Sequence, residues 1–289
     1  MLSLISAEML KVRKRRATWI MFAIFLTFIA FMVVGIRPIV LGEEGRDSVE
    51  FQALNEAIRF PMGFAVVLLF VSQMGRWNLI VFAALVVGSE YGWGTVRQVM
   101  ARGASRNRYL AAKLVAIALS ALLAMLMTLV IGSALMILGD LLVDGWGPTL
   151  PAGFFVDLAV DTLRTLGVLI AFGMVSFCIA LLTRSAAGGL GLGLGYLFVE
   201  AILVPMFGFF GGFWGDLADF LLTSLADSVM SGNSLGVGEF FTDGASGAGE
   251  GLGGGMDPAA AGLYLLLYGV VLLTISVWVF NRRDITGAG

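Results

Sequence analysis

The chain has 289 residues, of which 59% are hydrophobic and 13% are charged, and its mean hydropathy is +0.95. This composition excludes a water-soluble domain, and several apolar windows are long enough to cross a bilayer. The absence of histidine and the single cysteine, Cys178, exclude an intrachain disulfide framework and disfavour most membrane enzymes. We therefore predict an all-α integral membrane protein.

The N-terminal residues 1–16 combine apolar and basic side chains and predict an amphipathic helix that lies in the lipid headgroup layer. The first apolar stretch is residues 17–36. Its length of about 20 residues corresponds to roughly 30 Å of helix, enough to span the bilayer. Because no small-residue cleavage site follows it, we predict an uncleaved anchor.

Further apolar stretches predict five more spans, at residues 60–89, 109–138, 158–183, 188–207 and 259–280. The loops between the spans on the outer side are residues 37–59, 139–157 and 208–258. The last loop is acidic and glycine-rich, and residues 213–230 within it have the spacing of an amphipathic helix. Glycines from Gly188 to Gly195 predict close helix packing, not phosphate binding. We expect a single transmembrane domain over residues 1–289.

Charge distinguishes the two sides of the predicted bundle. Most of the 18 lysines and arginines lie in the N-terminal helix, in residues 88–113, at Arg184 and in the C-terminal tail, whereas most of the 20 acids lie in or beside the three loops. Because positive charge favours the inner side, we predict six spans with both termini cytoplasmic. Asp157, Asp161 and Arg164 would form an interfacial charge cluster near the outer surface.

The polar and basic segment 88–113 separates two long apolar runs, so it stays in water where a partner can reach it. Gly94 and Gly103 punctuate this segment, and Ser105 after the second glycine is an expected helix N-cap. The pattern predicts a short exposed helix that is joined directly to the second and third spans.

The sequence lacks the motifs of nucleotide hydrolysis and of intramembrane proteolysis. A phosphate loop ends in glycine followed by lysine, and none of the lysines Lys11, Lys14 and Lys113 follows a glycine. Without histidine or paired aspartates at mid-membrane depth, an intramembrane protease is not expected either. We therefore expect no catalysis, metal or cofactor in this chain.

Several features occur in a characteristic order: Glu8 to Lys11 near the N-terminus, the 88–113 segment with its glycine turns, and Arg283-Asp284 after the last span. In this order, and with six spans, the whole chain resembles the permease subunit of bacterial ABC transporters of the type-two exporter family. The resemblance implies a dimer with a second permease copy or a paralogue. It also implies a separate cytoplasmic ABC ATPase subunit, which would hold ATP and magnesium.

The resemblance gives the central segment, residues 90–108, a mechanical role, with the helix from Gly94 to Ala101 seated in the ATPase. The residues implied in coupling and ATPase contact are Glu90, Gly94, Thr95, Arg97, Gly103, Ser105 and Arg106. The alternative is that the arginines here only set the topology and contact anionic lipid. Glycine-threonine and glycine-x-serine turns, which lipid binding does not require, favour coupling.

Two charged residues are predicted inside the membrane. Arg76 and Glu200 each lie about 13 residues from the inner end of a span, which places both roughly 20 Å deep. Because an unpaired charge is costly there, we predict that the two residues pair or share a water-filled cavity. The resemblance implies that their spans line the translocation route. The alternatives are a pair that only pins two helices, or an Arg76 that snorkels outward.

The predicted function is a permease in a bacterial or archaeal plasma membrane that couples ATP hydrolysis in its partner to export by alternating access. Membrane lipid is a further expected partner, and nucleic acid is not. Two alternatives stay open: a non-transporting scaffold or sensor, and an ion-driven carrier that uses Glu200. A requirement for an ATPase would distinguish the permease from both alternatives. A proton-coupled flux that is lost in Glu200→Gln would favour the carrier.

Overall fold

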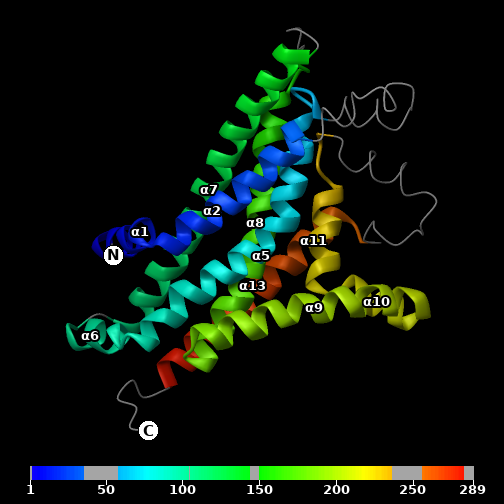
Figure 1. The fold of residues 1–289 in the computed structure, drawn as a ribbon. Coiled ribbons are helices and arrows are strands. Elements are labelled where there is room, and N and C mark those ends of the chain that lie inside the picture. The colour runs from blue at the N-terminus through cyan, green and yellow to red at the C-terminus, as the bar shows by residue number, and fades with distance from the viewer. Residues whose placement is uncertain (1, 36–57, 104, 144–149, 236–255, 283–289) are drawn as a thin grey trace.

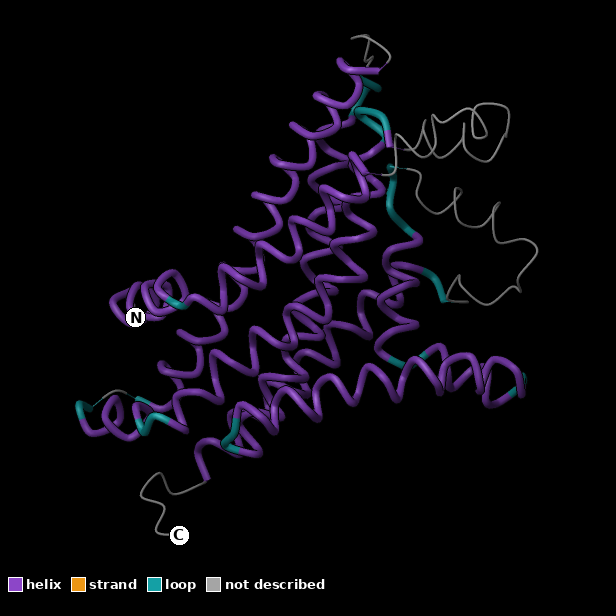
Figure 2. Tube along the Cα trace, in the orientation of Figure 1, coloured by secondary structure: helices purple, strands orange, loops and turns teal. Residues whose placement is uncertain are grey.

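The structure, a computed structural model, describes residues 2–35, 58–103, 105–143, 150–235 and 256–282, and these are helical apart from short connections (Figure 2). The elements in chain order are α1 (Leu2–Lys14), α2 (Arg16–Ala30), the π-helical η1 (Phe31–Gly35), α5 (Gly63–Gly92), α6 (Thr95–Ala101), α7 (Arg106–Val143), α8 (Phe154–Thr183), α9 (Ala186–Phe210), α10 (Phe213–Asp219), α11 (Leu222–Ser231) and α13 (Pro258–Arg282). Nearly all of the predicted 37–59 loop, the glycine-rich part of the 208–258 loop, and Arg283-Asp284 lie outside the described residues.

Within the described ranges, five helices are long and apolar enough to cross a membrane: α5, α7, α8, α9 and α13. They lie where five of the six spans were predicted, although α5 begins and ends three residues later than expected and α7 is longer than expected, at 38 residues. The predicted first span corresponds to α2, which has 15 residues and continues into η1. The structure confirms an all-α, multi-pass membrane fold, and the sixth span stays a prediction.

Helix α8 occupies the centre of the bundle and packs against α5, α9 and α13 (Figure 1). Most of its apolar stretch is buried within the protein, as expected for a helix that is apolar on all faces. In α7, α9 and α13 only a minority of the apolar stretch is buried within the protein, although these helices are also long and apolar. These exposed faces are the surface that suits a surrounding bilayer.

Glycine allows close contacts between helices in the bundle. A Cβ atom at Gly88 of α5 would lie 2.3 Å from the backbone nitrogen of Ala186, and one at Gly189 of α9 would lie 2.8 Å from the Cβ atom of Ala180. Larger side chains are therefore excluded at both positions. This confirms that part of the glycine face of the fifth predicted span serves packing. A Cβ atom at Gly191, by contrast, would meet no described atom within 4 Å.

Residues 213–230 do not form the single amphipathic helix that the sequence predicts. The chain breaks between α10 and α11, where Leu221 has an extended backbone with ψ of 146°. Helix α11 then enters the bundle, and its Leu222, Leu225 and Ala226 are fully buried in a cluster with residues of α8 and α13. A segment predicted as part of an outer loop therefore supplies part of the protein core.

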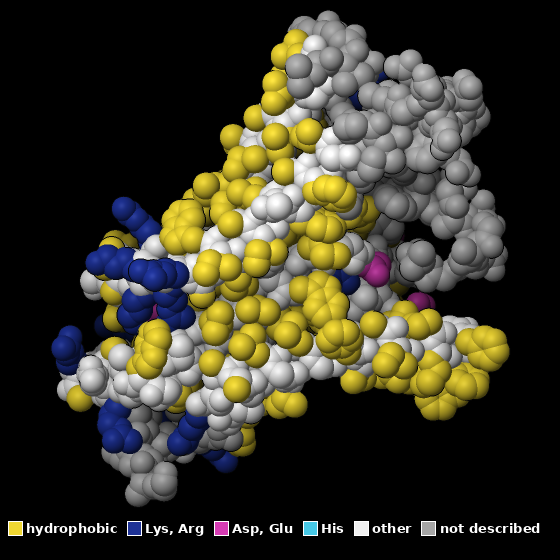
Figure 3. All heavy atoms as spheres, viewed as in Figure 1, with side chains coloured by type: hydrophobic (Ala, Val, Ile, Leu, Met, Phe, Trp, Pro, Cys, Tyr) yellow, Lys and Arg dark blue, Asp and Glu magenta, His cyan; other side chains and the backbone are white. Residues whose placement is uncertain are grey.

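One end of the molecule carries α1, α6 and the C-terminal end of α13 (Figure 1). Lysine and arginine side chains gather at this end, whereas hydrophobic side chains cover the flank of the bundle (Figure 3). We name it the basic end. The segments predicted to be cytoplasmic thus lie together, and the side of the membrane that they face stays a prediction.

Candidate functional site

Four charged side chains from three helices meet near the end of α5 that leads into α6. The Nζ atom of Lys11 in α1 lies 2.6 Å from Glu8 Oε1 and 2.8 Å from Glu90 Oε1 of α5. The Nζ atom of Lys113 in α7 lies 3.1 Å from Glu8 Oε2 and 3.0 Å from Glu90 Oε1. Two cations thus alternate with two anions in a closed ring, which we name the charge network. The hydroxyl of Tyr109 also donates a hydrogen bond to Glu90.

Three of the four network residues are buried: the side chains of Lys113, Glu90 and Glu8 are 1%, 2% and 7% exposed. Removing one partner of a buried ion pair costs about 3–5 kcal/mol, because the other charge stays buried and uncompensated. Here the charges sum to zero, and Lys113 also donates to the carbonyl of Val86 at 3.2 Å. The network therefore fixes α1 against α5 and α7.

Lys11 is the member of the network nearest to solvent, with 40% of its side chain exposed. Burial lowers the pKa of Lys11, but hydrogen bonds and charge attraction from Glu8 and Glu90 outweigh burial and raise the pKa above its ordinary value of 10.5. Lys11 is consequently a cation throughout the physiological pH range.

Arg15, between α1 and α2, extends this connection along α5. Its guanidinium donates hydrogen bonds to the carbonyl of Leu85 at 2.9 Å and to Ser89 Oγ at 2.6 Å, and it lies 5.1 Å from the centre of the Trp93 ring. Burial lowers the pKa of Arg15, and the carboxylates of Glu90 and Glu8 oppose this effect. Because the ordinary arginine pKa is so high, the side chain stays charged.

Helix α6 is the short exposed helix that the sequence predicts. Gly94 before it has φ of 66° and Gly103 after it has φ of 84°, the left-handed region that glycine adopts without steric cost. Val96 is buried beneath the helix, whereas Arg97 is exposed. The predicted helix and its glycine turns are confirmed, and its contact with an ATPase stays a prediction.

Two hydroxyl residues lie where α6 connects to the spans. The Oγ1 atom of Thr95 donates to the backbone carbonyl of Glu90 at 3.3 Å, which joins the first residue of α6 to the end of α5. Ser105 is exposed directly before α7, and its backbone carbonyl accepts the amide of Tyr109 at 3.1 Å. Ser105 therefore lies directly before α7, at the position where the sequence predicts the helix N-cap.

Arg106 links the start of α7 to the end of α13. Its guanidinium donates to the backbone carbonyls of Phe280 at 3.2 Å and Asn281 at 2.7 Å. Carbonyls at a helix C-terminus are otherwise unsatisfied and carry partial negative charge, so an arginine is favourable there. Arg106 thus joins the central segment, residues 90–108, to the last span, a contact that the sequence does not reveal.

The predicted ion pair between Arg76 and Glu200 is wrong. The Nη2 atom of Arg76 lies 2.9 Å from Asp227 Oδ1 of α11, and its guanidinium lies 5.1 Å from the centre of the Phe172 ring. Gln73 also donates to Asp227, at 3.4 Å. The Arg76 side chain is only 4% exposed, so Asp227 supplies the counter-charge that this depth requires.

Glu200 instead caps the N-terminus of α11. Its carboxylate accepts hydrogen bonds from the backbone amides of Leu222 at 2.8 Å and Thr223 at 3.1 Å, and from the hydroxyls of Thr223 and Tyr196. The amides in the first turn of a helix lack partners within the helix, and this helix end favours negative charge. In the described part of the chain, Glu200 therefore joins α9 to α11 without a cation, so the alternative of an Arg76–Glu200 pair that only pins two helices is also wrong.

Asp161 is buried, not part of a surface cluster as the sequence predicts. Its carboxylate accepts the backbone amides of Ser234 and Leu235, each at 3.2 Å. Arg164 donates to Asp161 at 3.2 Å and to the backbone carbonyl of Gly232. These two residues therefore fasten the chain after α11 to α8.

Sequence reasoning missed Asp227 and the pairing of Lys11 and Lys113 with Glu90. One signal was available: Glu8 and Lys11 lie one helical turn apart, the spacing at which opposite charges meet on one face. For Asp227 the available signal was Arg76, because an arginine deep in the membrane requires an acidic partner from another helix. In the part of the chain that the structure describes, no group of three acidic or cysteine side chains could hold a metal ion.

These observations define a multi-pass helical membrane protein with one basic end, where buried ion pairs brace an exposed helix. A family model described as ABC-2 family transporter protein matches residues 4–200, about two-thirds of the chain. The chain belongs to this family, as its resemblance to type-two exporter permeases implied. The family is a membrane component of transport that generally works with an ATPase partner. No curated protein matches the chain.

Proposed function

We propose that this protein is the membrane-spanning subunit of an ATP-driven transporter and that α6 couples it to a separate ATPase subunit. The observation that carries this proposal is the way in which α6 is held. It is exposed, it stands between α5 and α7 in the chain, and the charge network ties those two helices together beside it. A short helix attached in this way can transmit a displacement to two spans without unfolding.

The basic end is then the cytoplasmic side. Lysine and arginine side chains gather there (Figure 3), and positive charge is retained on the cytoplasmic side of membrane proteins. In this orientation α2 and η1 form the first of six spans, and both termini are cytoplasmic. The ATPase would meet α6 from this side and would hold ATP and magnesium, whereas this chain would hold no cofactor.

Family membership supports the remaining parts of the proposal. The subunit pairs with a second copy or a paralogue, resides in a plasma membrane, and exports its substrate by alternating access. The wide exposed apolar faces of α9 and α13 suit either lipid or a second permease subunit.

Affinity purification tests this function directly. The tagged protein is solubilised gently from its native membrane, and the eluate is assayed for co-purifying proteins and for ATPase activity. We expect an ATPase subunit that is lost when Thr95→Ala and Arg97→Glu are combined and retained in Lys14→Gln, a control at an exposed basic residue of α1. Recovery of the folded protein alone, without ATPase activity in several mild detergents, would contradict the proposal.

A further inference from the structure

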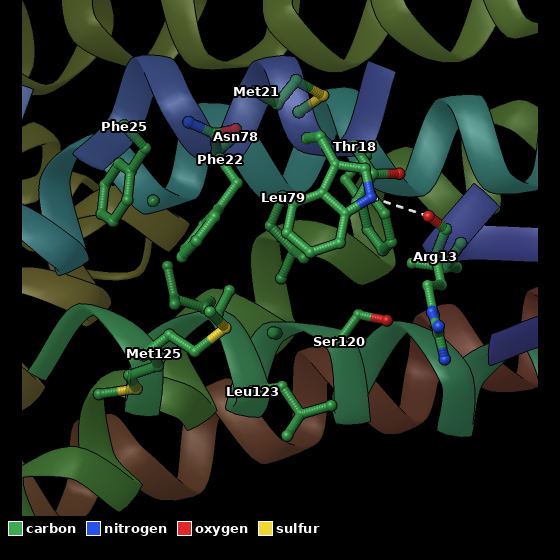
Figure 4. Close-up of a pocket in the computed structure, with 18 of the residues that line it drawn as sticks. Arg13, Thr18, Met21, Phe22, Phe25, Asn78, Leu79, Ser120, Leu123 and Met125 are labelled. Carbon is green, nitrogen blue, oxygen red and sulfur yellow. Dashed lines mark hydrogen bonds between the residues drawn. The ribbon is translucent and has the colours of Figure 1, made fainter. Parts of the chain in front are cut away.

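A cavity of about 590 Å³ lies between the N-terminal helices and the bundle. Helices α1 and α2 form one wall, and α5, α7 and α8 form the other (Figure 4). Its volume falls within the range of about 300–1,000 Å³ that is typical of small-molecule sites. The cavity is separate from the Arg76 pair and from the exposed surface of α6.

The cavity exists because α2 packs thinly on the bundle. Of the residues of α2, only Phe25 and Ile29 are buried. Between α2 and the neighbouring spans, apolar side chains face a space that the protein does not fill. In a bilayer such a space is filled by the nearest apolar groups, which are lipid acyl chains.

Polarity is distributed unevenly along the cavity (Figure 4). Arg13, Thr18 and Ser120 lie toward one end, and Phe22, Phe25 and Met125 lie toward the other. Asn78 of α5 is an exception, because it is a polar side chain on the apolar side. Arg13, Thr18 and Ser120 come from α1, the start of α2 and the half of α7 nearer the basic end. The cavity is therefore mainly apolar with polar groups toward the basic end, as a lipid in that leaflet requires.

Arg13 gives the polar end a positive charge. It is exposed, and its guanidinium pairs with no acid among the residues that the structure describes. The indole nitrogen of Trp19 donates to the Arg13 backbone carbonyl at 2.8 Å, which holds this part of the chain at the cavity. Lys14 and Arg16 are exposed beside it. Basic residues at this depth attract anionic headgroups.

We propose that this cavity binds a phospholipid with an anionic headgroup, which braces α1 and α2 against the bundle. One acyl chain occupies the apolar half, and the phosphate lies against Arg13. The charge of Arg13 distinguishes this occupant from a neutral lipid, and the length of the apolar wall distinguishes it from a free phosphate. The inference does not depend on coupling to an ATPase.

Photolabelling of the reconstituted full-length protein tests whether an acyl chain occupies the cavity. The probe is phosphatidylglycerol with a photoreactive group on one acyl chain, and mass spectrometry maps the labelled residues. We expect label on cavity residues of α2 and α7, such as Phe22 and Leu123, and its loss in Ala124→Phe, which fills the cavity. Val130→Phe, on an exposed face of α7 outside the cavity, should label as the wild type does.

The headgroup is tested with the same probe built on phosphatidylcholine. The wild type should prefer phosphatidylglycerol, and Arg13→Gln should reduce that preference about fivefold, the change expected for one basic residue near the surface. Lys14→Gln, which does not line the cavity, should change it less. Equal labelling by both probes in the wild type would overturn the anionic assignment.

Labelling that spreads over all exposed faces and survives cavity filling would overturn the site itself. If Ala124→Phe does not fold, Met127→Trp fills the cavity from a position that is 45% exposed and tolerates a larger side chain more readily. Each purified variant is first checked for a single monodisperse species, so that loss of label reports on the cavity.

Discussion

The Nζ atom of Lys113 lies 3.0 Å from Glu90 Oε1, although the two residues stand on opposite sides of α6 in the chain. This contact closes the loop formed by the end of α5, α6 and the start of α7. Because both side chains are almost fully buried, the end of α5 and the start of α7 cannot separate without breaking a buried ion pair, and Thr95 of α6 is hydrogen-bonded to the Glu90 carbonyl. The three elements are therefore expected to move as one body.

Glu90→Gln should destabilise the protein by about 3–5 kcal/mol, because it leaves excess positive charge in a buried network. Thermal unfolding in mild detergent measures this change. Asp216→Asn, at an exposed acid, is the matched control and should unfold like the wild type. Combining Glu90→Gln with Lys113→Met removes one charge of each sign and leaves Lys11 paired with Glu8, so it should recover part of the loss. Equal unfolding of Glu90→Gln and the control would refute the network.

Gly94→Ala should displace α6, because a left-handed backbone costs a residue with a side chain roughly 1–2 kcal/mol. Space is not the obstacle, since a Cβ atom there would meet no described atom within 4 Å. Gly94→Asn should be milder, because asparagine tolerates this region better. Gly92→Ala is the control, with equal space but no positive φ. The readout is ATPase recovered in affinity purification, and equal loss in Gly92→Ala would rule out the backbone explanation.

Exchanging the charges of Arg76 and Asp227 together should restore the expression and thermal stability that either single charge reversal destroys. Arg76→Asp and Asp227→Arg each place two like charges in the bundle, whereas the double variant re-forms a pair of opposite charges. Expression and thermal stability are the readouts, with transport added once a substrate is known. Combining Arg76→Glu with Glu200→Arg should not help, because these two residues have other partners. Rescue by that second combination alone would contradict the structure.

At alkaline pH, deprotonation of Lys11 should weaken the attachment of α1 to α5. Its folded pKa is raised above 10.5, so its stabilising effect is fully present below 10.5 and is lost as the pH rises through the folded value. Hydrogen exchange in α1 should therefore rise, beyond the ordinary increase with pH, at a lower pH in the wild type than in Lys11→Arg, which stays charged. Identical profiles for the two proteins would show that Lys11 does not hold α1.

Gly88→Ala should destabilise the bundle by about 1–3 kcal/mol, the usual cost of overpacking. The added Cβ atom would lie 2.3 Å from the backbone of Ala186, which cannot rotate out of the way as a side chain can. Gly191→Ala faces open space and serves as the control. Unfolding midpoints in detergent separate the two variants, and an unchanged midpoint for Gly88→Ala would mean that α5 and α9 are further apart than described.

The spans could be predicted from the sequence because each is a long apolar run, a property that does not depend on the rest of the fold. Their ends could not, since α5 and α7 continue as helices beyond the apolar stretch that defines a span. The apolar spacing of residues 213–230 indicated a helix with one apolar face. It did not indicate that α11 would turn this face into the bundle, because amphipathicity does not distinguish a protein core from a membrane surface.

For the site, depth alone showed that Arg76 needs a counter-charge, since a buried cation is costly anywhere in the bilayer. The identity of the partner depends on where α11 lies, and Asp227 is 151 positions further along the chain. The glycine turns around α6 could be predicted because a tight turn needs the backbone freedom of glycine, which is a local property of the sequence. The charge network was not, because it combines α1, α5 and α7, which only the tertiary fold brings together.

Cross-linking from α6 tests the proposed coupling most directly. A cysteine is introduced as Gln98→Cys, at an exposed position of α6, in a Cys178→Ala background, and Phe213→Cys on α10 is the control away from the basic end. Each cysteine is alkylated with a maleimide that carries a photoreactive group. With the candidate ATPase present and under illumination, we predict a covalent product from Gln98→Cys that changes in yield when ATP is added, and none from Phe213→Cys. A folded, reactive Gln98→Cys protein that never cross-links to an ATPase would contradict the account.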